Sequence, residues 1–471
     1  MNEMPSEAER IGDSAAMTNL RTIPCVHSGS YPVRTGNLVR ILVDGEPAFR
    51  RICAAIEAAR SRVWVTVTFM WATFVMPDER GSALDVLDRA AARGVDVRLI
   101  FWRPDAETET WKHNAFWGSV DQIAHLEGRG SGVRIRWDRA HPGFCQHQKS
   151  WLIDAGGVSE TAFVGGINLN PHSLAAPGHR GEGQNHDVYV EVTGPSAVDV
   201  HHNFVQRWNE ASERHAEDGR WGVGSETDLP FPAHVPAQRG NALVQIQRTM
   251  HRGRYTDGRP APEGAWFDIA SGEQAIFTQY CAAINAAQRS IYIENQYIEV
   301  PEIVACLHHA LRRGVDVLLL LPAEPVLAVR PDAPERQSFL EARAALGAYE
   351  HFTLAGIAGL GADGRRTPVY VHAKLMLVDD VWATIGSCNL HSYSLFGNGE
   401  MNAAFWGPAT VRGLRSALFQ EHLDHDTSRL DDRAALQLFR TVALANRRRF
   451  SAGNHGWQGL AFSLDPASYG R

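Results

Sequence analysis

The chain has 471 residues, 44% of them apolar and 21% charged, an ordinary composition for a globular protein with room for two or three domains. Its formal net charge of −7 argues against sequence-independent binding of DNA or RNA, because such binding usually needs a basic surface. The six cysteines show no paired CxxC spacing, which argues against a zinc knuckle and against a disulfide framework.

Hydropathy along the chain predicts neither a membrane span nor a leader. No run approaches the roughly 18 apolar residues of a spanning helix. Residues 1–20 include acidic side chains and lack an apolar h-region, so a secretory signal peptide is not expected. We expect a cytoplasmic protein or one bound peripherally to a membrane, and export without a leader stays open.

Helical and strand patterns alternate along most of the chain. Apolar residues at helical spacing, together with continuous apolar runs typical of strands covered on both faces, indicate an α/β protein. The expected helices are residues 47–60, 83–93, 273–288, 303–313 and 431–449. The expected strands are residues 63–69, 95–101, 243–248, 291–297 and 315–322.

The chain also repeats itself. Cys53–Ala59 returns with one change as Cys281–Ala287, and Arg93–Val97 returns unchanged as Arg313–Val317. Matches in the same order at nearly one spacing indicate duplication, so we predict two homologous α/β/α sandwich halves with mixed central sheets. The predicted parts are an N-terminal extension (1–38), a first half (39–210), a connection with one strand (211–266), a second half (267–425) and a C-terminal helix and tail (426–471).

A third repeated element carries the chemistry. The pattern H-x-K-x4-D occurs twice, at His147, Lys149 and Asp154 and again at His372, Lys374 and Asp379. Only three of the 46 Lys and Arg residues are lysines, and two of them stand in these motifs. Residues two apart on a strand project from the same face. An imidazole beside an ammonium suits a phosphate, because one can attack or protonate while the other neutralises charge.

A short turn follows each motif, Gly165-Gly166-Ile-Asn168 in the first half and Gly386-Ser387-Cys-Asn389 in the second. Small residues allow close backbone approach to a ligand, and an amide can donate to a phosphoryl oxygen. We therefore predict that Gly166, Asn168, Ser387 and Asn389 contribute to a phosphate site. Residues 155–161 are an insertion before the first turn and predict a longer hairpin there.

The duplicated motif with its G-[GS]-x-N turn resembles the phospholipase D superfamily over about residues 42–406. Ile291–Tyr297 resembles the I-Y-I-E-N-Q-[YF] segment of phospholipases D proper. Residues 186–195, 203–208 and 244–249 are similar to further strings of those enzymes. The resemblance implies a pseudo-dimer of two phospholipase D-like halves that share one active site.

The resemblance also implies a mechanism. One histidine attacks phosphorus to form a covalent phosphohistidine, while the other protonates the leaving alcohol and later activates water or another alcohol. We assign attack to His147 and acid/base work to His372. The non-bridging oxygens would be held by Lys149, Lys374, Asn168 and Asn389. Side chains neutralise the phosphate, so no metal and no cofactor is expected in the reaction.

Each histidine needs a carboxylate on its other ring nitrogen. By resemblance Glu400, which follows His372 in the chain, serves one histidine, and Asp187, which follows His147, serves the other. We expect the motif aspartates, Asp154 and Asp379, to hold structure at the strand ends.

The favoured function is hydrolysis of the head-group diester of a phospholipid at a membrane surface, with water or an alcohol as acceptor and one chain sufficient for activity. Three alternatives stay open: a phosphatidyltransferase like cardiolipin synthase, a nuclease or other non-lipid phosphodiesterase, and an inactive lipid-binding scaffold. The apolar clusters at residues 69–76 and 111–117 suit either membrane insertion or core packing. The sequence leaves the oligomeric state open.

Overall fold

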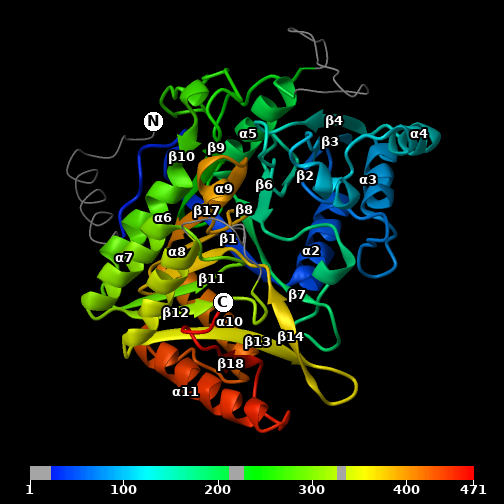
Figure 1. The fold of residues 1–471 in the computed structure, drawn as a ribbon. Helices are drawn as coiled ribbons and strands as arrows, with labels where there is room; N and C mark the ends of the chain where they lie inside the picture. The colour runs from blue at the N-terminus through cyan, green and yellow to red at the C-terminus, as the bar shows by residue number, and fades with distance from the viewer. Residues whose placement is uncertain (1–22, 212–227, 326–335, 471) are drawn as a thin grey trace.

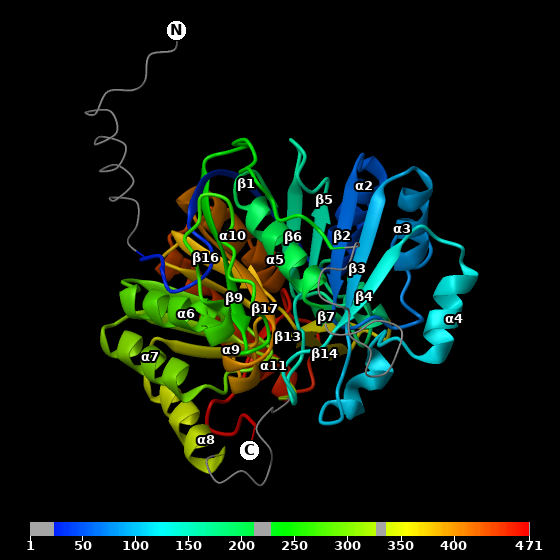
Figure 2. The same cartoon turned by 90° about the horizontal axis from the view of Figure 1, so that it is seen from above.

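The computed structural model describes residues 23–211, 228–325 and 336–470. The predictions for residues 1–20, and for residues 212–227 of the predicted connection, lie outside these ranges. Figure 1 shows two α/β halves, with the blue and cyan elements of the first on the right and the yellow to red elements of the second on the left and below. Figure 2 shows the same division from above. The predicted fold class is confirmed.

The strands of the first half form one mixed sheet in the order β1-β8-β6-β5-β2-β3-β4. The pairs β2–β3 and β3–β4 are parallel, and the other neighbours are antiparallel. The strands are β1 (Arg34–Val43), β2 (Arg62–Val67), β3 (Asp96–Trp102), β4 (Arg134–Asp138), β5 (Ser150–Ile153), β6 (Thr161–Gly165) and β8 (Val188–Thr193).

The second half repeats this sheet in the order β9-β17-β16-β15-β11-β12-β13. Position by position, the strand directions match those of the first sheet, so the sequence repeat is a repeat of topology. The strands are β9 (Ala242–Met250), β11 (Ser290–Glu294), β12 (Asp316–Leu320), β13 (Phe352–Leu360), β15 (Leu375–Val378), β16 (Trp382–Gly386) and β17 (Glu400–Trp406). Short partners are β10 (Glu273–Gln274) on β9, and β14 (Arg366–Val371) and β18 (Ala461–Ser463) on β13.

Helices cover both faces of each sheet. Because side chains alternate along a strand, Val63 and Val65 of β2 pack with α2 and α3, whereas Trp64 stacks on Phe204 of α5 with ring centroids 5.1 Å apart. The core on this second face contains residues of both halves, so the halves fold against each other. The helices are α2 (Gly45–Ala58), α3 (Ala83–Ala92), α4 (Val120–Gly128), α5 (Ala197–Asn209), α6 (Ala275–Ala286), α7 (Pro301–Arg312), α8 (Arg336–Ala344), α9 (Ser392–Phe396), α10 (Pro408–Leu423) and α11 (Asp432–Ser451).

The two sheets meet along β6 and β8 of the first half and β16 and β17 of the second. Two further pairings join them, β1 with β9 and β14 with the short strand β7 (Asn185–His186). The second pairing matters for function, because it places the chain just before the second motif beside the first half.

Some element roles differ from the sequence prediction. The strand expected within the connection is β9, and it belongs to the second sheet, where it pairs with β17 on one side and with β10 and β1 on the other. Strand β1 begins at Arg34, inside the stretch assigned to the N-terminal extension, and the tail contains β18. The longer first hairpin is present, since residues 154–160 join β5 to β6 whereas residues 379–381 join β15 to β16.

Candidate active site

The two motifs begin at one place on the boundary between the halves. The backbone N–H of His147 donates to the carbonyl of Gly399 at 2.8 Å, and that of His372 donates to the carbonyl of His186 at 2.8 Å. Each carbonyl belongs to the residue just before a predicted acidic partner. Each motif strand is therefore fastened to the acid-bearing strand of the other half.

The acidic partners cross between the halves. Nδ1 of His147 lies 3.0 Å from Oε2 of Glu400, and Nδ1 of His372 lies 2.6 Å from Oδ2 of Asp187. Each pair joins a histidine of one half to a carboxylate of the other. Each carboxylate accepts a hydrogen bond from Nδ1–H, which fixes the tautomer and leaves Nε2 of each ring for chemistry.

The two carboxylates differ in their surroundings. Glu400 also accepts from the hydroxyl groups of Ser387 and Ser394, both at 2.5 Å, and from the Asn398 amide at 3.3 Å. Burial would raise the pKa of Glu400, but His147, Lys149 and the hydrogen bond from Ser387 lower it overall. Asp187, by contrast, accepts from His372 and, at 2.8 Å, from the N–H of Val188.

The imidazoles of His147 and His372 are both buried away from water. Burial lowers the pKa of His372 to about 4, with a further contribution from Lys374. Burial also lowers the pKa of His147, although Glu400 opposes the shift. In the free protein both rings are therefore neutral at pH 7, the form that an attacking imidazole needs. His372, which we expect to act as the acid, would take up a proton once an anionic phosphate neutralises the charges of Lys149 and Lys374.

The two lysines are held in equivalent ways. Lys149 donates to the carbonyl of His147 at 2.7 Å and to the Thr68 hydroxyl at 3.4 Å. Lys374 donates to the carbonyl of His372 and to the Gln296 side chain at 3.4 Å. Burial lowers the pKa of Lys149 to about 8 and that of Lys374 to about 7. Within the described residues both ammonium groups hydrogen-bond to uncharged oxygens, which leaves their charge available to an anion.

The two turn asparagines are placed for a ligand. The side-chain oxygens of Asn168 and Asn389 are buried and have no hydrogen-bond partner in the described part of the chain. Buried amide oxygens without partners are rare in folded proteins. The hydroxyl of a bound alcohol could donate to them, whereas a phosphoryl oxygen could accept only from the amide N–H groups. The equivalent atom is unpartnered in each half, which a packing accident would not produce twice.

The turn residues before the asparagines have unlike roles. A Cβ added to Gly166 would lie 2.4 Å from Oδ1 of Asp187, so glycine is needed there for the carboxylate to reach His372. Its counterpart in the second half, Ser387, instead donates its hydroxyl to Glu400. Ser387 and Gly166 thus contact the acids, and their predicted contact with phosphate stays a prediction.

The motif aspartates lie at the far ends of the motif strands. Oδ1 of Asp154 accepts from the N–H groups of Arg60 and Ser61, each at 2.8 Å. Asp379 accepts from the N–H groups of residues 288, 289 and 290, each at 2.8 Å. These contacts fasten the corner between a helix and the following strand, in line with the structural role expected of both residues.

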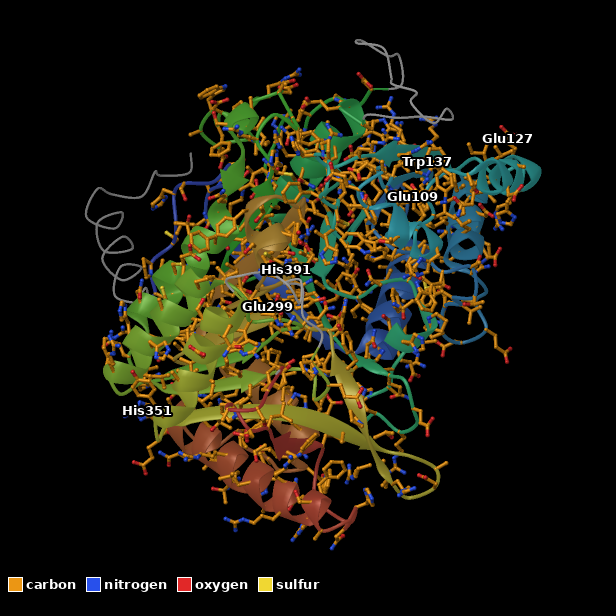
Figure 3. The ribbon with its side chains drawn as sticks, in the orientation of Figure 1. Glu109, Glu127, Trp137, Glu299, His351 and His391 are labelled. Carbon is orange, nitrogen blue, oxygen red and sulfur yellow. The ribbon has the colours of Figure 1, made fainter. Side chains whose placement is uncertain are left out.

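Sequence reasoning missed three residues of the site. Thr68 and Gln296, which contact the lysines, occupy the same position of the repeat, in residues 63–69 and 291–297, and the repeat could have identified them. His391 caps α9 by accepting from the N–H of Ser394 at 3.2 Å, and burial lowers its pKa to about 4. Figure 3 places His391 and Glu299 near the middle of the molecule and His351 at its edge.

The apolar clusters divide between the two expected roles. Phe74 and Met76 are buried in the core of the first half, as core packing predicts. Phe69 lies edge-on to His147, with ring centroids 6.3 Å apart, and forms one wall of the site. Val75 and Trp111 are about half exposed, at 54% and 43%. They are the most exposed of the large apolar side chains in the two clusters.

Two family profiles match this chain. A family profile described as "Cardiolipin synthase, PLD-like domain" matches residues 52–208 and 280–422, one match in each half and together more than half of the chain. The chain belongs to the phospholipase D superfamily. A second profile of the same superfamily, described as "Phospholipase D", matches residues 180–300.

Relatives of this phospholipase D superfamily member cover most of its length. Cardiolipin synthase A of Pseudomonas entomophila is 29% identical over 406 residues, 84% of this chain and 70% of that protein. A cardiolipin synthase of Listeria monocytogenes is 23% identical over 392 residues, 82% of this chain and 69% of that one. The phosphatidylserine synthase structure from Haemophilus influenzae matches with a TM-score of 0.54 and 15% identity, over 93% of this chain and 98% of that one, which supports the fold alone.

Within the described residues, no helix combines the length and the apolar character that crossing a bilayer requires.

Proposed function

We propose that the protein is a phosphatidyltransferase of the cardiolipin-synthase type, which moves a phosphatidyl group from one phospholipid to the alcohol of another. The observation that carries the proposal is the pair of crossed contacts, His147–Glu400 and His372–Asp187. Together they present two imidazoles, two lysines and two asparagine amides whose oxygens have no partner among the described residues at one boundary. This is an arrangement for a phosphodiester with an acid/base group opposite a nucleophile.

The first step is a displacement at phosphorus. Nε2 of His147 forms a bond to phosphorus as the bond between phosphorus and the leaving alcohol oxygen breaks. His372 gives its Nε2 proton to that oxygen, so the alcohol departs neutral. Lys149 and Lys374 neutralise the charge on the non-bridging oxygens, which would otherwise repel the incoming lone pair.

The second step reverses the roles. His372, now neutral, takes the proton of the acceptor hydroxyl, and the acceptor oxygen attacks phosphorus while the bond to His147 breaks. Both histidines return to their first states, so the cycle balances without an oxidant, a reductant or a bound nucleotide. The acceptor alone decides between hydrolysis and transfer, since water and an alcohol use the same base.

A lipid alcohol is the favoured acceptor because the relatives named above are cardiolipin synthases. Cardiolipin contains two phosphatidyl groups joined by one glycerol, so transfer onto phosphatidylglycerol would produce it. Hydrolysis of a head-group diester is the second candidate. It is favoured by the "Phospholipase D" profile over residues 180–300, which include the Ile291–Tyr297 segment similar to phospholipases D proper.

The test is a product assay on defined vesicles. Purified protein is incubated with phosphatidylglycerol, and cardiolipin, free glycerol and phosphatidate are measured by mass spectrometry; a His147→Ala variant is the blank. Cardiolipin and glycerol in equal amounts support transfer. Phosphatidate without cardiolipin supports hydrolysis, and a parallel assay with phosphatidylcholine then measures choline release. Cleavage of DNA or of a soluble diester, with no lipid product, would reject both.

A further inference from the structure

A second group of histidines and acids lies behind the candidate active site. It comprises Asp44 at the start of α2, His179 and His186 between β6 and β8, and Glu421 on α10 of the second half. One ligand atom from each of the four residues lies within 4.8 Å of the others. Asp44, His179 and His186 are fully buried, and the Glu421 side chain is 8% exposed. None of the four takes part in the mechanism above.

The histidine nitrogens of this group face each other as well as the acids. His179 Nε2 and His186 Nδ1 lie 3.3 Å apart, so a hydrogen bond between them would need one nitrogen to present a lone pair. Nε2 of His179 also faces Asp44 Oδ2 and Glu421 Oε1, each at 3.3 Å. The Asp44 oxygen has no hydrogen-bond partner among the described residues, although it is buried. A metal ion bound here would give that buried oxygen the partner it lacks.

The distances match a tetrahedral ion. Zinc bonded to nitrogen and oxygen at about 2.0–2.1 Å places neighbouring ligand atoms about 3.3–3.4 Å apart. Here His179 Nε2 lies 3.3 Å from His186 Nδ1, from Asp44 Oδ2 and from Glu421 Oε1, so the three separations around this nitrogen have that spacing. His186 Nδ1 lies closer to the other oxygen of each carboxylate, 2.9 Å from Asp44 Oδ1 and 3.9 Å from Glu421 Oε2. Four converging donors, two imidazoles and two carboxylates, suit zinc better than calcium or magnesium, which prefer oxygen alone.

The other nitrogen of His186 is also occupied. Nε2 of His186 lies 2.9 Å from Oε2 of Glu294 on β11. The other oxygen of Glu294 accepts from the Tyr292 hydroxyl at 2.5 Å. A metal-ligating histidine commonly donates its second N–H to a carboxylate, which fixes the tautomer and raises its basicity. His186 thus has the two contacts expected of a metal ligand, one on each ring nitrogen.

We propose that Asp44, His179, His186 and Glu421 bind one structural zinc ion that joins the two halves behind the active site. Three ligands belong to the first half and the fourth to the second. His186 immediately precedes Asp187, and its carbonyl accepts the N–H of His372. The N–H of Asp44 donates to the carbonyl of Asp187 at 2.8 Å. The ion therefore supports the loop that holds Asp187 against His372, and it takes no part in the bond changes.

Metal content tests the proposal without any activity assay. The full chain is purified without a metal-affinity tag, passed through metal-free buffer, and analysed for all transition metals by inductively coupled plasma mass spectrometry. About one zinc per chain is expected. Replacement by cobalt should give the intense visible absorption of a four-coordinate site. A folded wild-type chain that binds no metal, even after zinc is added, overturns the proposal; one equivalent of a different metal overturns the assignment to zinc.

Two variants locate the ion. His179→Gln removes a ligand outside the catalytic machinery. At the same free zinc concentration, its zinc content should be at least about tenfold lower than that of the wild type. The matched control is His201→Gln, because His201 is also buried and contacts one carboxylate, Glu160, at 2.8 Å. The control should keep its zinc. Equal zinc in His179→Gln and wild type would overturn the assignment; if His179→Gln does not fold, the wild-type cobalt spectrum decides.

Discussion

The two halves provide the same catalytic parts in the same strand order, but they surround their acids differently. In the second half Glu400 shares its charge among His147, two hydroxyl groups and an amide. In the first half Asp187 is shorter, lies against Gly166, and directs one oxygen at His372 from 2.6 Å. The two halves thus keep equivalent positions for the catalytic side chains, but the surroundings of the two acids differ.

That difference suggests unequal roles for the histidines. A carboxylate that accepts few other hydrogen bonds interacts more strongly with a positively charged imidazole, because its negative charge is not shared among other donors. Asp187 is therefore suited to a ring that gains and loses a proton, which is the role assigned to His372. Glu400, whose charge is spread over four donors, is suited to orienting a ring that stays neutral until it attacks. The predictions below test this inequality.

The largest expected effect is the loss of either histidine. His147→Ala and His372→Ala should each lower turnover of a phospholipid by about 10⁴-fold or more, because each removes a group that no neighbour replaces. The double variant should be hardly worse than either single one. Turnover is measured with labelled lipid, and circular dichroism checks the fold. Substantial activity in either single variant would contradict a shared site.

The same two variants distinguish the nucleophile from the acid when the leaving group needs no proton. With a p-nitrophenyl phosphodiester, His372→Ala should release about one equivalent of p-nitrophenol and keep phosphorus on His147, because the second step lacks its base. His147→Ala should give no burst. Peptide mapping of the adduct identifies the labelled residue, and label on any other side chain rejects the assignment.

The next largest effect compares the acids. Asp187→Asn should lower kcat by about 10³-fold or more, because the imidazole of His372 loses the acceptor that fixes its tautomer. Glu400→Gln should cause a loss of kcat that is about ten times smaller. Neither exchange changes size, so both variants should fold. Steady-state kinetics on the same vesicles provide the comparison. Equal losses, or a larger loss for Glu400→Gln, would show that the unlike surroundings do not divide the roles.

A smaller effect concerns pH. A lysine with a lowered pKa loses its charge at a lower pH than usual, and the pKa values here are about 8 for Lys149 and about 7 for Lys374. Binding of inorganic phosphate should therefore be strong below pH 7 and weaken as pH rises through 7 to 9, by up to about tenfold per unit for the coupled pair. Phosphate inhibition measured against pH checks this. Affinity that stays constant up to pH 9 would contradict it.

The sequence predicted most of the fold and both motifs because duplication leaves a signal that needs no partner chain. It did not predict that Glu400 contacts His147 and Asp187 contacts His372, since distance along the chain says nothing about crossing between halves. The sheet position of β9 was missed for a similar reason, because the pattern of a single strand does not show which strands it pairs with. The proposed zinc ligands could not be predicted from the sequence, because Asp44 and Glu421 lie far apart along the chain.

The smallest effect on catalysis is expected at the motif aspartates. Asp379→Ala would leave three backbone N–H groups without an acceptor, and Asp154→Ala would leave two. Each change should lower the free energy of unfolding by about 1–3 kcal/mol, because part-buried donors lose their acceptor. The larger loss is expected for Asp379→Ala, since the hydrogen bond from Ser290 is fully buried. Activity per folded molecule should stay within about twofold of the wild type. Urea unfolding and active-site titration measure the two quantities separately. A variant that keeps its stability and loses turnover would place that aspartate in the chemistry instead.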